Sequence, residues 1–285
     1  DDAGAIRAFK MLRTLQPDDR RAQEQLKRRY VALKDWEALE DFYGQSGRWD
    51  ELIRILEREA DGQDTEPEAR VALLFRAAGL WLDKNGKAER AARAYEKIFQ
   101  TDPDNREAAE ALSPIYEVAG DARRRAPVYE VRLRHELEPG DRVALLRATG
   151  RLYEDKLRQP QTAYEKYLEA FRAEPSEADA REDAARLAAA VKDWDPLAQA
   201  YEATIADALG DDALALRMSF AEMLRGIDRT EDAIGQYVAV LDVQPDHADA
   251  IAAVTGLYEK AERWADMRSV LERRMEIEGD PAVRR

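Results

Sequence analysis

Residues 91–103 read AARAYEKIFQTDP, and the spacing within this stretch decides the fold. A small residue is followed by an aromatic residue four positions later, by an apolar residue three positions after that, and by proline five positions further on. Offsets of four and three place these side chains on one face of an α-helix. The proline then ends the helix, because its ring cannot continue the hydrogen-bond ladder. The spacing occurs four times: Ala5, Phe9, Leu12 and Pro17; Ala91, Tyr95, Ile98 and Pro103; Ala163, Tyr167, Ala170 and Pro175; Ala233, Tyr237, Val240 and Pro245.

A second, weaker helical unit lies between these strong units, and it is built around a tryptophan after a turn. The matching sets are Trp194, Leu197, Tyr201 and Ile205, and Trp264, Met267, Leu271 and Met275, while the segment 121–133 fits the same frame with Ala122 in the tryptophan position. The step from a strong unit to the next weak unit has the same length each time: Ala91 to Arg125, Ala163 to Leu197, and Ala233 to Met267. Strong units recur after slightly more than two such steps, so the sequence predicts pairs of helical hairpins. First turns of helices are indicated by Pro67, Pro139, Pro160 and Pro196.

The step of about 34 residues, the paired helices and the TDPDN turn at 101–105 resemble the tetratricopeptide repeat (TPR), with some likeness to the half-a-TPR type. The resemblance covers nearly the whole chain. It implies an all-α fold without strands, a right-handed α–α superhelix (solenoid) of about seven TPR-like helical hairpins and about sixteen helices.

On this frame, residues 1–285 are expected to form a single TPR-like solenoid that is a fragment of a longer array. Its predicted parts are a half hairpin at 1–18, an irregular unit with an extra helix at 19–64, paired hairpins at 65–138, 139–210 and 211–280, and the start of a further repeat at 281–285. The extra helix is expected because Trp36-Leu39-Tyr43 and Trp49-Leu52-Leu56 repeat one signature well before a full repeat length has passed, and a break in the superhelix is the alternative.

Two further local features are expected. Pro114 and Pro127 predict a kink or a late helix start around Ala122. Apolar residues of the outermost helices lack a neighbour in this frame, so the chain is expected to associate end to end; they are Phe9, Leu12, Leu15, Leu271 and Met275.

Composition excludes several classes of function. The net charge of -14 disfavours nucleic acid, whose affinity comes from Lys and Arg. No apolar run approaches the roughly 20 residues that span a bilayer, so no membrane insertion is expected. Cysteine is absent, which removes disulfides and thiolate chemistry. The cytoplasm is the default location, with the periplasm left open, and the Arg- and Ala-rich composition resembles that of bacterial proteins.

The sequence offers no catalytic or metal site. Motifs for phosphate, nucleotide, acyl-transfer and zinc chemistry are missing. His135 and His247 lie in different hairpins, far apart along the chain, and have no carboxylates at ligand spacing. Asp211 and Asp212 are interpreted as helix-start charges, and the five tryptophans as core residues. We therefore expect no enzyme activity, no metal and no cofactor.

The TPR resemblance implies that the chain is a scaffold that binds another protein or an extended peptide on the concave face of its first helices. The residues that this implies as contacts are Arg76, Arg147, Arg151, Glu182, Arg186, Glu222 and Arg225. Their mixed charge favours a partner segment with both signs. The carboxylate clamp of some TPR proteins is missing, because Asn85 and Asn105 both lie in turns. The alternatives are a structural spacer or self-assembling rod, and a regulatory repeat region whose catalytic domain lies elsewhere.

Overall fold

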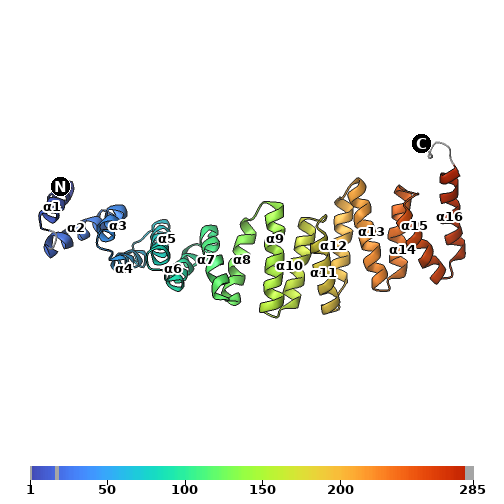
Figure 1. Cartoon of the computed structure of the whole chain (residues 1–285), viewed down its shortest axis with the longest axis horizontal. Coiled ribbons are helices and arrows are strands. Elements are labelled where there is room, and N and C mark those ends of the chain that lie inside the picture. Colours follow the sequence, from blue (N-terminus) through green and yellow to red (C-terminus); the bar gives the residue numbers. More distant parts are fainter. Residues whose placement is uncertain (1, 17–18, 280–285) are drawn as a thin grey trace. The chain divides into compact units, whose positions relative to one another are not determined.

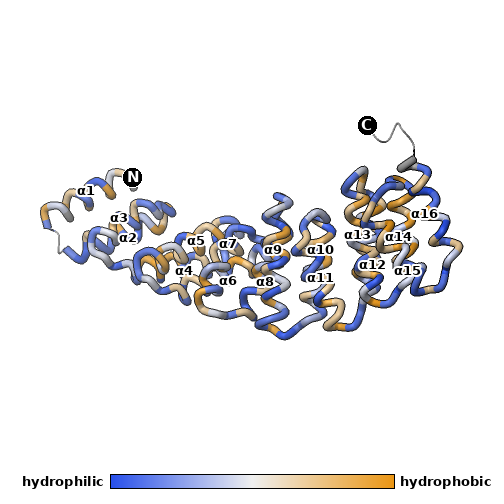
Figure 2. The backbone as a smooth tube through the Cα atoms, turned by 45° about the vertical axis from the view of Figure 1, so that its right-hand side comes forward, coloured by the Kyte–Doolittle hydropathy of each residue, from blue (hydrophilic) through white to orange (hydrophobic). Residues whose placement is uncertain are grey.

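The computed structural model describes residues 2–16 and 19–279, and within these ranges every regular element is a helix. There are sixteen α-helices and one short π-helix, η1, and the described residues contain no strand, as the sequence predicts (Figure 1). Apolar and polar residues alternate along the helices at helical spacing (Figure 2). The chain divides into two compact units, residues 1–132 and 133–285. The right-handed superhelix and the single continuous solenoid stay predictions.

The first unit contains short antiparallel helices that pack in chain order. They are α1 (Asp2–Leu15), α2 (Arg20–Ala32), α3 (Trp36–Gly44), α4 (Trp49–Ala60), α5 (Pro67–Asp83), α6 (Ala88–Thr101) and α7 (Arg106–Ala119), followed by α8 (Ala122–His135), which crosses into the second unit. The two closely spaced tryptophan signatures begin two separate helices, α3 and α4.

The second unit continues with helices of similar length. They are α9 (Pro139–Arg151), η1 (Leu152–Lys156), α10 (Pro160–Ala173), α11 (Ala178–Val191), α12 (Asp195–Asp207), α13 (Gly210–Gly226), α14 (Thr230–Val243), α15 (Ala248–Lys260) and α16 (Trp264–Gly279). The sequence predicts that 71–84 and 143–156 are the same helix used twice. The second copy differs, since its last turn widens into η1, where the Leu157 amide donates to the Leu152 carbonyl.

The strong repeat frame is the core of the fold. All nine frame residues of its last three copies are buried, and α6, α10 and α14 end two residues before Pro103, Pro175 and Pro245. The first copy differs, because Phe9 is half-buried and Leu12 is exposed, while Pro17 lies outside the described residues. The prolines expected in first turns begin α5, α9, α10 and α12.

Two local expectations are wrong. The late helix start is excluded, because α8 begins at Ala122 and runs through Pro127, and α7 runs through Pro114. The tryptophans are not all core residues. Trp81 is buried, but Trp264 is 58% exposed, because no described helix follows α16 to cover it.

Ion pairs join successive second helices at the repeat spacing. In each pair a carboxylate in the first turn of one helix, where the helix dipole favours it, meets a cation at the start of the second helix of the next hairpin. The pairs are Asp50–Lys87 at 3.7 Å and Glu89–Arg124 at 3.1 Å in the first unit, and Asp195–Arg229 at 3.7 Å and Glu231–Arg263 at 2.7 Å in the second. These charges fix which turn of one helix lies beside the next.

Candidate partner-binding site

In the second unit, the first helices of three successive hairpins, α11, α13 and α15, line a groove of about 830 Å³. The groove exists because the facing positions of α11 and α15 are mostly alanine, which leaves room between the helices. Tyr201 of α12 lies at its inner side. The lining residues are Ala178, Arg181, Glu182, Ala185, Tyr201, Met218, Ser219, Glu222, Met223, Arg225, Asp249, Ala252 and Ala253.

The apolar part of the groove is adaptable. Met218 and Met223 project from α13, and methionine side chains adjust to irregular surfaces because they are unbranched and flexible. The alanines on either side present a flat apolar surface. A segment that lies here would bury apolar side chains against α13.

The charged part of the groove carries more free acid than free base. Arg225 pairs with Glu222 at 3.5 Å, and Arg181 donates to the Pro175 carbonyl. Within residues 2–16 and 19–279, Glu182 has no ion-pair partner, and Asp249, in the first turn of α15, has none either. Both carboxylates are exposed. The groove therefore offers two uncompensated carboxylates to a bound cation.

Three of the seven residues predicted from the sequence, Glu182, Glu222 and Arg225, line this groove together. The other four lie elsewhere. Arg76 in the first unit pairs with Glu40 at 3.3 Å, and Arg151 is exposed at the end of α9. As contacts to a partner, all seven stay predictions.

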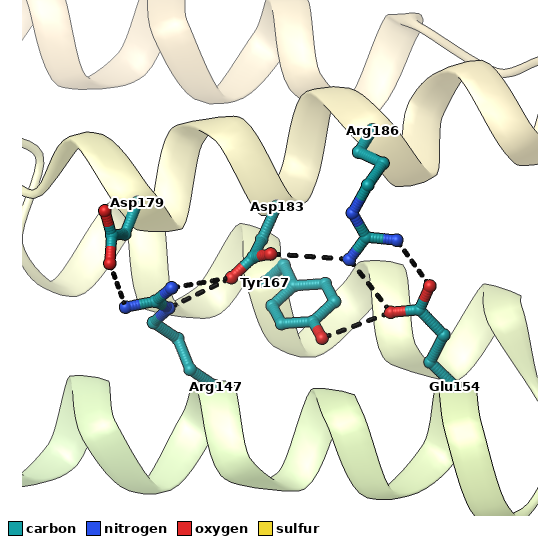
Figure 3. A network of polar contacts seen from close by, with 6 residues as sticks. All are labelled: Arg147, Glu154, Tyr167, Asp179, Asp183 and Arg186. Atoms are coloured by element: carbon teal, nitrogen blue, oxygen red, sulfur yellow. Dashed lines mark hydrogen bonds and ion pairs between the residues drawn. The ribbon is translucent and has the colours of Figure 1, made fainter.

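Arg147 belongs to a polar network between α9 and α11 (Figure 3). Its guanidinium donates to Asp179 at 2.8 Å and to Asp183 at 3.0 Å, one turn apart on α11. These carboxylates raise the pKa of Arg147 against the opposing effect of burial. Because both acids engage Arg147 within the chain, this cation is less available to a partner than the sequence suggests.

Arg186 continues the same network toward η1. It contacts Asp183 at 3.3 Å and forms a two-pronged ion pair with Glu154, one arm of which is 2.9 Å long (Figure 3). The Tyr167 hydroxyl also donates to Glu154, at 3.3 Å. The Arg186 guanidinium lowers the pKa of Glu154, and burial, helped by Asp183 and Glu154, raises the pKa of Tyr167 to about 12. The network thus holds α9, η1, α10 and α11 together.

Sequence reasoning did not name most of these partners. The signal was available, because Asp179 and Asp183 follow Arg147 by about one repeat length, as Arg186 follows Glu154. Opposite charges one repeat apart indicate an ion pair between neighbouring hairpins. The groove residues Met218, Met223 and Asp249 give no comparable signal, since their meeting depends on how three hairpins stack.

The described residues form no cluster of three or more His, Cys, Asp or Glu side chains placed to hold a metal ion. His247 has a local role, because it precedes α15 and its Nδ1 accepts a hydrogen bond from the Ala250 amide at 3.3 Å. Across the part of the chain that the structure describes, no helix combines the length and apolarity that a membrane span requires.

Comparison with known proteins identifies the repeat. Residues 30–68, which include α3 and α4, match the family model of the tetratricopeptide repeat. No curated protein matches the chain. With the helical hairpins described above, this match supports a TPR-like helical repeat family for the chain, and such repeats generally serve as protein-interaction scaffolds.

Solved structures with some likeness to the chain are also TPR proteins. A TPR protein from Parabacteroides merdae ATCC 43184 is 15% identical, with 85% of this chain and 99% of that chain covered and a TM-score of 0.36. YrrB, described as a TPR protein with an unusual peptide-binding site, is 20% identical, with coverages of 75% and 89% and a TM-score of 0.28. MamA from Desulfovibrio magneticus RS-1 is 17% identical, with coverages of 68% and 96% and a TM-score of 0.32. The functional argument below rests on the groove and not on these likenesses.

Proposed function

We propose that the chain is a protein-interaction scaffold that holds an extended partner segment in the groove lined by α11, α13 and α15. The observation that carries the proposal is the groove itself, with exposed apolar side chains beside carboxylates that have no ion-pair partner in the described chain. Stacked helical hairpins commonly present such a surface to a peptide.

The charges of the groove indicate the chemistry of the partner. Glu182 and Asp249 are uncompensated, whereas both arginines that line the groove have contacts within the chain. The favoured segment therefore carries Lys or Arg for these carboxylates and an apolar residue between them for Met218 and Met223. The net charge of -14 adds a long-range attraction for such a segment.

The test is quantitative affinity capture from the native cell lysate, followed by binding measurements with the captured protein. The groove variant is Glu182→Lys combined with Asp249→Lys, and the control is Glu202→Lys, an exposed acid on α12 outside the groove. We expect the groove variant to lose the partner and the control to retain it. Equal capture by both variants would refute the groove as the binding site.

The alternatives of a spacer or self-assembling rod and of a regulatory repeat region predict other outcomes. A rod would associate with itself without a partner, which sedimentation over a range of concentrations measures. A regulatory region would be captured together with a covalently linked catalytic domain in the native protein. Neither alternative explains why uncompensated carboxylates gather around Met218 and Met223.

A further inference from the structure

A second pocket lies in the first unit, between α6 and α8 and above α7. Its volume is about 370 Å³, in the lower part of the roughly 300–1,000 Å³ range of ligand pockets. Most of its lining is apolar, and three charged side chains stand among it. The lining residues are Glu96, Phe99, Pro103, Leu112, Tyr116, Arg123, Arg124, Pro127, Val128 and Val131.

The equivalent place in the second unit is filled. One paired hairpin later along the chain, Phe171 takes the position of Phe99. Phe171 is fully buried, its ring lies 4.8 Å from the Tyr201 ring, and α10 packs directly against α12. Phe99 is only partly buried and lines an open pocket. The same fold therefore closes this space in one copy and leaves it open in the other.

The sequence explains the difference. The helix beneath the two second helices is α11 in the closed copy, where the facing residues are Ala184 and Ala188. In the open copy the matching residues of α7 are Leu112 and Tyr116, both buried and much larger. Larger side chains below keep α6 and α8 apart, and the small, ring-closed side chain of Pro127 does not cover the gap.

One cation at the rim of the pocket is free to bind. Arg124 is occupied by Glu89 at 3.1 Å and Asp121 at 2.7 Å, and Glu96 accepts from Tyr116 and lies 3.6 Å from Arg124. Arg123 is exposed, and no ion pair or hydrogen bond of its side chain occurs within the described ranges. An apolar cavity beside an unpaired guanidinium fits an apolar side chain that has a carboxylate next to it.

We propose that the pocket between α6 and α8 is a second docking site, which takes a bulky apolar side chain, such as Phe or Leu, from a partner segment whose adjacent Asp or Glu pairs with Arg123. This site lies on second helices in the first unit, whereas the groove proposed above lies on first helices in the second unit. Its partner chemistry is opposite in charge to that of the groove, and the two proposals stand or fall separately.

The test uses the full chain and a blocked peptide, Gly-Glu-Phe-Glu-Gly, titrated while amide chemical shifts are followed by NMR. Pro127→Trp covers the pocket with an indole, and Pro127→Ala is its matched control. Both changes restore a backbone N–H inside α8, so both variants should fold at least as well as the wild type. We expect the peptide to shift amides around Phe99 and Val128, Pro127→Ala to bind as the wild type does, and Pro127→Trp to bind at least about tenfold more weakly.

The charge is tested with Arg123→Glu and with the peptide Gly-Lys-Phe-Lys-Gly. The wild type should prefer the Glu peptide and Arg123→Glu the Lys peptide. Peptide Gly-Glu-Ala-Glu-Gly, which lacks the ring, should not bind the pocket. No pocket shifts at millimolar Glu peptide, or equal affinities of Pro127→Ala and Pro127→Trp, would overturn the docking site. An unchanged charge preference in Arg123→Glu would overturn the role of Arg123.

Discussion

Gly150 and Tyr167 show how single residues set the distance between helices. A Cβ atom at Gly150 of α9 would lie 2.7 Å from the ring of Tyr167, which is fully buried in α10. Neither the ring nor the helix has room to move. The small-residue and aromatic pattern in the sequence predicts such a close crossing, and the structure identifies the glycine on the facing helix as the residue that permits it.

Gly150→Ala should therefore destabilise the protein, although alanine favours helix by about 1 kcal/mol over glycine. Overpacking a closed core costs about 1–3 kcal/mol, and the clash with Tyr167 falls in this class. The matched control is Gly235→Ala in α14, where the new Cβ meets nothing within 4 Å and should stabilise by up to about 1 kcal/mol. Denaturant melts measure both, and a stabilised Gly150→Ala would contradict the proposed packing.

Tyr167 and Tyr237 occupy the same frame position but use their hydroxyl groups differently. The Tyr167 hydroxyl donates to Glu154, whereas the buried Tyr237 hydroxyl has no hydrogen-bond partner in the described chain. Burial raises the pKa of Tyr237, and the Glu222 carboxylate also raises it without coming within hydrogen-bond distance. Sequence periodicity gives the positions of both rings but not these polar contacts.

We expect Tyr167→Phe to lower the free energy of unfolding by about 1 kcal/mol, and Tyr237→Phe to leave it unchanged or raise it. The reason is that the first change removes a hydrogen bond and strands Glu154, while the second removes a buried hydroxyl without a partner. Chemical denaturation of the two variants checks this. If Tyr237→Phe were as destabilising as Tyr167→Phe, its hydroxyl would have to bond Glu222 in solution.

At the scale of elements, hairpin order was readable from the sequence, while the shape of individual helices was not. Prolines at the starts of α5, α9, α10 and α12 occupy first turns as predicted, because a missing N–H has no consequence there. Pro127 was misinterpreted as delaying α8. Its side chain faces the open pocket, so the helix loses one hydrogen bond without a steric clash against a neighbour. The widening of α9 into η1 left no mark in the periodicity.

The pairing of α9 with α11 depends on the Arg147–Asp183 contact. Both side chains are mostly buried, with 19% and 17% exposed. A double-mutant cycle of Arg147→Ala and Asp183→Ala should therefore give a coupling energy on the order of 1–2 kcal/mol. The control cycle is Arg273–Asp242, which are 49% and 63% exposed and should couple by less than about 0.5 kcal/mol. Equal coupling in the two cycles would show that burial does not strengthen the network.

For the whole molecule, buried tyrosines set the upper limit of pH stability. Burial is the main cause that raises the pKa of Tyr43 in the first unit, and of Tyr164 and Tyr167 in the second, to about 12. In the unfolded chain these groups titrate near 10. Between these values the unfolded chain releases protons that the folded chain retains, so stability falls as pH rises.

We accordingly expect the free energy of unfolding to be level up to about pH 10 and to decline from there toward pH 12. Denaturant melts at several pH values measure the decline, and tyrosinate absorbance reports the ionisation. Tyr164→Phe removes one of these groups, so its decline should be shallower than that of the wild type. A profile that stays level to pH 12 would mean that the tyrosines are accessible to water.

The last prediction concerns self-association and follows from a comparison of α12 with α16. In α12, Tyr201 is buried because α13 covers it and Phe220 stacks on its ring at 5.0 Å. The same frame position in α16 is Leu271, and with Trp264 and Met275 it is exposed in the described structure. This face has the shape and chemistry that receives a helix elsewhere in the same chain. At the other outermost helix, Met11, Leu12 and Leu15 of α1 are exposed as well.

Two unlike apolar faces on one chain can join head to tail, and such contacts continue from molecule to molecule. We therefore expect the average mass in sedimentation equilibrium to rise with protein concentration. Leu271→Glu combined with Met275→Glu should abolish the rise, while Val118→Glu, at an exposed apolar site on α7, should not. A mass that stays monomeric at every concentration would refute the association and would also remove the rod from the candidate functions, because a rod must assemble through these faces. Association that persists in the α16 double variant would place the contact on another surface.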